Sequence, residues 1–109
     1  MTCGEIYLVK KPGAPDPKRR RAFVAVSRQV LMDSNYASVI CAPVYSTNSG
    51  LASQVTVGTD EGLKHSSAVH CDGLVSIAKS ELTDYVGSLG DRKLAELSAA
   101  LKVALAVED

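Results

Sequence analysis

The sequence predicts an α+β fold in which a twisted β-sheet or small β-barrel is backed by one C-terminal α-helix. Two observations lead to this class: many short, β-rich segments separated by turn residues, and one amphipathic segment of helical period at the end of the chain. With 109 residues the chain suits a single domain, 1–109. Its hydrophobic content of 46% is ordinary for a protein with a buried core.

The N-terminal part predicts two strands joined by an exposed loop. Residues 5–9 are rich in β-formers and indicate the first strand. Residues 10–18 contain three prolines and a glycine, which exclude a helix or an interior strand. Residues 22–27 form a short, continuously apolar run, which is typical of a buried strand. Residues 29–36 end in a turn signal and predict either a short helical turn or a loop.

The middle of the chain predicts further short strands. Residues 37–45 indicate a third strand, in which Pro43 requires a bulge, a sheet edge or a strand end. Residues 46–50 are polar and predict a loop. The remaining strands are expected at 54–57, 67–71, 74–77 and 84–87, with a polar connection at 58–65 and a break at Asp72-Gly73.

The last segment predicts a helix that begins after Gly90, where Asp91 can cap it. Its leucines recur at helical spacing, while most charged residues fall outside that apolar stripe. The stripe consists of Leu94, Leu97, Leu101, Ala104 and Leu105.

Several classes of protein are excluded by composition. The first five residues lack the basic-then-apolar order of a signal peptide, and no apolar run approaches the roughly 20 residues that span a bilayer. We therefore expect a cytoplasmic protein that does not contact membranes. The cysteines, Cys3, Cys41 and Cys71, are odd in number and far apart, which favours reduced thiols over disulfides or a zinc site. With two histidines and no clustered carboxylates, we expect neither a metal nor another cofactor.

Positive charge is concentrated near the N-terminus, although the formal net charge is zero. Neutrality argues against a protein that binds polyanions over its whole surface, but a local basic patch can still attract a phosphate backbone at one face. The first 28 residues hold seven of the twelve positive charges: Lys10, Lys11, Lys18, Arg19, Arg20, Arg21 and Arg28.

The order of these segments resembles the MazF/PemK/Kid family. Gly4–Val9 is similar to the family's opening Gly-acid-Ile-aromatic-x-Val strand, and Arg21–Val26 stands in its Arg-Pro-Val-x-Val place. Val39–Val44 resembles the Val-x-Pro-hydrophobic strand. Ser66–Asp72 is closest to the Kid version, Val-Val-Arg-Cys-Asp, and Gly87–Leu105 resembles the closing Gly-x-Leu and terminal helix.

This resemblance implies a compact SH3-like barrel, a homodimer, cleavage of single-stranded RNA, and inhibition by a MazE-like antitoxin whose flexible tail covers the site. The sequence departs from the family at two places near the expected site. The family's proline after the arginine is Ala22 here, and its Thr or Ser after the Pro-hydrophobic pair is Tyr45. In the first loop, which is one residue longer than usual, Asp16 stands for the family's Glu.

RNA can be cut without a metal when its own 2′-OH attacks the adjacent phosphorus. The protein must then supply a cation for the phosphate, a base and an acid. Arg21 is the expected cation, because a guanidinium fork suits two phosphate oxygens and the residue stands where a basic loop meets a buried strand. Arg20 replaces it if the register differs by one residue.

His70 and Asp72 are the expected proton carriers. They lie two residues apart, so a straight strand would carry both side chains on one face. Asp72 is expected to act as the base or to orient the nucleophile, and His70 to move a proton near neutral pH. A surface histidine and a turn-forming Asp before Gly73 are the alternatives, and the sequence leaves open which residue is acid and which is base.

Other residues are expected to bind the RNA, with hydroxyls that reach phosphate and a tyrosine that stacks on a base. Solvated charges and an ordinary polar loop are the alternative explanation for these residues. The RNA-binding set is Lys18, Arg19, Arg20, Tyr45, Ser46, Thr47, Ser66 and Ser67.

Two other functions share the predicted fold. The first is a toxin like CcdB, which binds DNA gyrase and depends on its C-terminal residues; this chain ends in Ala106-Val107-Glu108-Asp109 and lacks that apolar aromatic ending. The second is a catalytically inactive family member kept as a binding or regulatory protein, which the change to Tyr45 allows.

Overall fold

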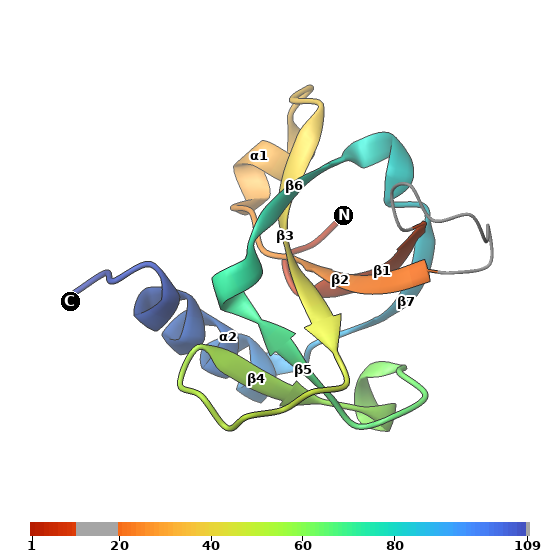
Figure 1. Cartoon of the computed structure of the whole chain (residues 1–109). Helices are drawn as coiled ribbons and strands as arrows, with labels where there is room; N and C mark the ends of the chain where they lie inside the picture. The colour runs from red at the N-terminus through yellow and green to blue at the C-terminus, as the bar shows by residue number, and fades with distance from the viewer. Residues whose placement is uncertain (11–19, 109) are drawn as a thin grey trace.

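The computed structural model describes residues 1–10 and 20–108, which form a strongly curled antiparallel sheet and helices (Figure 1). Within these residues the sheet has seven strands in the order β4-β5-β3-β2-β1-β7, and β6 pairs with β3. The strands are β1 Glu5–Lys10, β2 Arg20–Ala25, β3 Ser38–Tyr45, β4 Gln54–Val57, β5 Ser67–His70, β6 Val75–Ala78 and β7 Asp84–Ser88. The predicted α+β class is confirmed.

The helices are short except the last one. The ambiguous segment after β2 forms α1, Gln29–Asp33, whose C-terminal end is stabilised by the Lys79 ammonium, which donates to the Leu31 and Ser34 carbonyls at 3.1 and 2.7 Å. Among the described residues no helix is long and apolar enough to cross a membrane. The other helical segments are the 3₁₀ turns η1 Thr59–Glu61, η2 Cys71–Gly73 and η3 Lys79–Glu81, and the predicted C-terminal helix, α2 Asp91–Ala104.

Strand β2 begins two residues earlier than the apolar pattern predicts. The ladder with β1 continues to Val9↔Arg21 and Lys10↔Arg20, so both arginines belong to the strand although they are charged. Because successive side chains of a strand point to opposite faces, Arg20 and Arg21 lie on different sides of the sheet. Backbone pairing therefore fixes where each guanidinium can go.

Pro43 explains why β5 ends where it does. The Val26 amide donates to the Ile40 carbonyl at 2.9 Å, so by alternation Phe23↔Pro43 is a non-hydrogen-bonded pair of β2 and β3. The proline nitrogen consequently faces the other edge of β3, where the neighbour changes from β6 to β5. Proline cannot donate to that ladder. The register places His70 opposite Pro43, and β5 stops at His70 and passes into η2.

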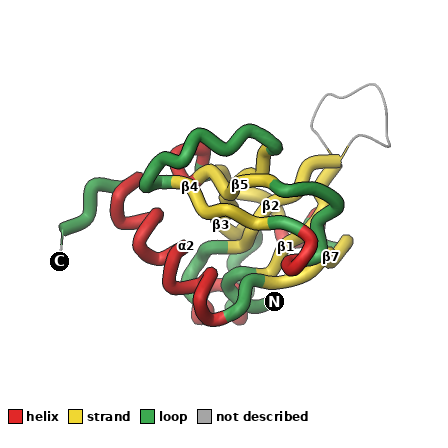
Figure 2. Tube along the Cα trace, turned by 90° about the horizontal axis from the view of Figure 1, so that it is seen from below, coloured by secondary structure: helices red, strands yellow, loops and turns green. Residues whose placement is uncertain are grey.

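Two apolar cores cover the two faces of the sheet. Along β1, β2 and β3, alternate side chains belong to one core or to the other. Helix α2 covers one face of the sheet beside β4, as Figures 1 and 2 show. The core under α2 contains Ile6, Val24, Ala42, Val44, Val55, Val57, Val69, Cys71, Leu89, Leu97 and Ala100. The other contains Tyr7, Val9, Ala25, Met32, Val39, Cys41, Ile77 and Leu82.

Candidate active site

Arg21 and Tyr45 are in direct contact. The pairing of Phe23 with Pro43, continued by two residues, places Arg21 of β2 opposite Tyr45, the last residue of β3. The Arg21 Cζ atom lies 4.2 Å from the centroid of the Tyr45 ring, which is a cation–π contact. Arg21 is half-buried, so its charge is held at the surface within reach of a bound anion.

His70 contacts the same tyrosine from β5. The two ring centroids are 4.8 Å apart with an interplanar angle of 75°, which is an edge-to-face arrangement. The His70 Nε2 atom lies 2.8 Å from the Thr47 carbonyl oxygen. Because a carbonyl can only accept, Nε2 carries the proton, and Nδ1 is the nitrogen that this bond leaves for proton transfer.

Asp72 is not carried on a strand with His70. The expectation of one straight strand is wrong here, because β5 ends at His70 and Asp72 lies in the 3₁₀ turn η2. Its carboxylate accepts a hydrogen bond from the Ser53 hydroxyl at 2.6 Å, and the Cys71 amide donates to the Ser53 carbonyl at 3.1 Å. Ser53 is only 6% exposed and ties the turn after His70 to the segment before β4. Sequence reasoning missed Ser53, because a serine beside a strand carries no local signal.

Arg20 and Ser67 do not join these residues but line a cavity elsewhere. Arg20 forms an ion pair with Asp84 of β7, and both border a cavity of about 590 Å³ that Ser67 also lines. The Ser67 hydroxyl donates to the His65 carbonyl at 3.2 Å. The alternative in which Arg20 takes the place of Arg21 is therefore the weaker one, since the charge of Arg20 is matched by a carboxylate.

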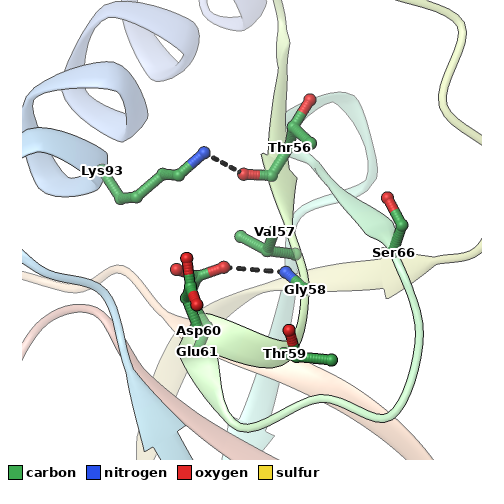
Figure 3. Close-up of a pocket in the computed structure, with 8 residues that line it drawn as sticks. All are labelled: Thr56, Val57, Gly58, Thr59, Asp60, Glu61, Ser66 and Lys93. Carbon is green, nitrogen blue, oxygen red and sulfur yellow. Dashed lines mark hydrogen bonds between the residues drawn. The ribbon is translucent and has the colours of Figure 1, made fainter.

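Ser66 lines a second cavity, of about 400 Å³, between β4, η1 and α2 (Figure 3). There the Lys93 ammonium donates to the Thr56 carbonyl at 2.6 Å, and the Glu61 carboxylate accepts from the Gly58 amide at 2.7 Å. The Lys93 ammonium and the Glu61 carboxylate are thus engaged with backbone atoms of the cavity wall.

The remaining predicted RNA-binding residues divide in two. Ser46 and Thr47 lie in the exposed loop after β3, and the backbone of Thr47 contacts His70. Lys18 and Arg19 lie outside the described residues. The structure thus brings together Arg21, Tyr45, His70 and the Thr47 carbonyl, and we call this set the arginine–tyrosine–histidine cluster.

The cysteine nearest the cluster is a neutral thiol at physiological pH. Burial, with a smaller contribution from the Asp72 charge, raises the pKa of Cys71 to about 11. Burial likewise raises the pKa of Cys41 to about 12. Because the thiolate is the nucleophilic form, neither residue suits nucleophilic catalysis.

Comparison with known proteins identifies the family. A model described as PemK-like, MazF-like toxin of type II toxin–antitoxin system matches residues 2–105. No curated protein sequence matches the chain significantly. Among solved structures, the Mycobacterium tuberculosis toxin MazF-mt6 is 25% identical with a TM-score of 0.82, over 96% of this chain and 99% of that one.

Two more solved structures share the fold at lower identity. An endoribonuclease in complex with its cognate antitoxin from a mycobacterial species is 21% identical, with a TM-score of 0.84 over 100% of this chain and 98% of that one. The MazE–MazF structure (Form-II) from Deinococcus radiodurans is 19% identical, with a TM-score of 0.75 over 99% and 97%. On the strength of the family match over nearly its whole length, the chain belongs to the PemK-like, MazF-like toxins of type II toxin–antitoxin systems.

Proposed function

We propose that this toxin is a metal-independent endoribonuclease that cuts single-stranded RNA, including mRNA, at particular sequences. The observation that supports this most is the arginine–tyrosine–histidine cluster, which places a permanent cation and an imidazole around one ring at the sheet surface. Cleavage of this kind needs no more from a protein than charge stabilisation and proton transfer at one phosphate.

In the proposed reaction the RNA 2′-oxygen attacks the adjacent phosphorus and the bond from phosphorus to the 5′-oxygen breaks. The products are a 2′,3′-cyclic phosphate and a free 5′-hydroxyl. Arg21 stabilises the negative charge that builds up on the phosphate oxygens, which its two-pronged donor geometry suits. His70 accepts the 2′-hydroxyl proton on Nδ1, because Nε2 is bound to the Thr47 carbonyl, and then donates that proton to the departing 5′-oxygen.

We assign Asp72 a supporting role. Its hydrogen bond with Ser53 holds the turn that directly follows His70, and so fixes the end of the strand that carries the imidazole. Arg20, Ser66 and Ser67 border two other cavities, and we propose that they contact parts of the RNA away from the cut.

Two protein partners are also proposed. A MazE-like antitoxin is supported by the related structures described as toxin–antitoxin complexes, and we propose that it covers the cluster. A homodimer is supported by exposed apolar side chains at the C-terminal end, since a small domain gains by burying such surface against a second copy. These side chains are Val103, Leu105 and Val107. Sedimentation that shows only monomer at micromolar concentration would contradict the dimer.

The decisive experiment incubates the purified protein with a long single-stranded RNA in EDTA and maps the fragment ends. We expect cuts at a few defined sequences, each leaving a cyclic phosphate. Arg21→Ala should cut on the order of 100-fold more slowly, because one transition-state charge contact is lost. Arg92→Ala is the matched control, since this arginine of α2 has a side chain that is 94% exposed.

Intact RNA after incubation with folded wild-type protein would refute the nuclease. An Arg21→Ala rate equal to that of Arg92→Ala would leave the nuclease in place but remove Arg21 from its mechanism.

A further inference from the structure

Tyr45 stands between the two groups to which the chemistry is assigned. Arg21 belongs to β2 and His70 to β5, and β3, which carries Tyr45, pairs with both strands. The guanidinium carbon is 4.2 Å from the Tyr45 ring centroid, and the imidazole centroid is 4.8 Å from it. One ring therefore contacts the cation and the proton carrier at the same time.

Both contacts use the aromatic ring rather than its hydroxyl. The cation lies over the ring, and the imidazole meets it edge to face. An arginine side chain has several rotatable bonds and little preference for one rotamer at a surface. A flat π-surface 4.2 Å away restricts the guanidinium to one region while leaving its N–H donors to face solvent or an anion.

We propose that Tyr45 is a positioning residue, whose ring holds Arg21 and His70 in place for the proposed cleavage. The ring stands at the position where the family pattern has a small hydroxyl residue, so this chain holds its cation by stacking. The ring area that the guanidinium covers is not free for a nucleobase, which argues against base stacking as the main role of Tyr45. The consequence for cleavage rests on the proposed function, whereas the contact itself is testable without RNA.

The first test is spectroscopic and needs no activity. In NMR spectra, protons of the Arg21 side chain should be shifted upfield by the ring current of Tyr45. Tyr45→Phe should keep this shift, while Tyr45→Ala and Tyr45→Leu should lose it. Leu preserves apolar bulk without a π-surface and serves if the alanine variant is unstable. Tyr36→Ala is the control, because Tyr36 is an exposed tyrosine of the loop after α1.

The second test separates positioning from hydroxyl chemistry and from base binding. Tyr45→Phe should cut RNA within about threefold of the wild-type rate, whereas Tyr45→Ala and Tyr45→Leu should lower kcat by about 10- to 100-fold, the usual penalty of a misplaced group. KM should change little, because the nucleotide does not bind to this ring.

Three results would overturn the proposal: an Arg21 proton shift that survives in Tyr45→Ala, a Tyr45→Phe variant as slow as Tyr45→Ala, or a loss confined to KM. A wild-type protein that does not cut RNA would refute the nuclease instead, and the NMR shifts would still decide whether Tyr45 holds Arg21.

Discussion

Removal of the Ser53 hydroxyl should loosen the turn that follows His70. The Ser53 hydroxyl donates to the Asp72 carboxylate at 2.6 Å, a short charge-assisted bond, and Ser53 is nearly fully buried. Hydrogen bonds to charged groups contribute about 1.5–3 kcal/mol. Asp72 is exposed and regains water in the variant, so we expect Ser53→Ala to lower the free energy of unfolding by about 1.5 kcal/mol, the low end of that range.

The assay is urea unfolding followed by far-UV circular dichroism, on Ser53→Ala, Asp72→Ala and the double variant. If the two side chains act through their mutual bond, the double variant should lose about 1 kcal/mol less than the sum of the single losses. Ser98→Ala on the exposed side of α2 is the control and should be neutral or slightly stabilising. Losses that add within about 0.3 kcal/mol would refute the reasoning.

Two further predictions concern packing and pH. Gly87→Ala should lower the free energy of unfolding in urea by about 2–4 kcal/mol, because its Cβ would overlap the Glu61 carbonyl oxygen and lie 2.9 Å from the carbonyl carbon. Gly90→Ser is the control, because the space around Gly90 is open. An equal loss in both variants would contradict the overlap. Burial raises the folded-state pKa of Cys41 from 9.0 and of Tyr7 from 10.0, each to about 12, so the folded protein retains protons that the unfolded chain loses. The free energy of unfolding should fall as pH rises from about 9 towards 12, less steeply in Cys41→Ala, and a flat profile in this window would contradict the prediction.

The sequence predicts elements best where one local pattern decides them. The helix over Asp91–Ala104 follows from leucines at helical spacing, although its N-cap is Gly90 and the predicted cap, Asp91, is its first helical residue. Strand bounds are less accessible. The charged start of β2 at Arg20 depends on pairing with Lys10 of β1, and an apolar pattern in one strand contains no information about its partner.

The sequence predicts individual residues of the site but not the contacts among them. The sequence predicts Arg21 and His70 as separate residues, yet their connection through Tyr45 depends on the registers of three strands. The proline within β3 is a partial signal, because it cannot donate to a neighbouring ladder. Pro43 therefore indicates that the strand beside it must stop, and this would have separated His70 from Asp72.

Two consecutive arginines begin β2, and only core packing decides which of them contacts Tyr45. If β2 slipped by one residue against β3, Arg20 would meet Tyr45, and the ring would still hold a guanidinium. The same slip would turn the fully buried Val24 out of the core beneath α2. Burial of Val24 thus selects the register in which Arg21 meets Tyr45 and leaves Arg20 to pair with Asp84.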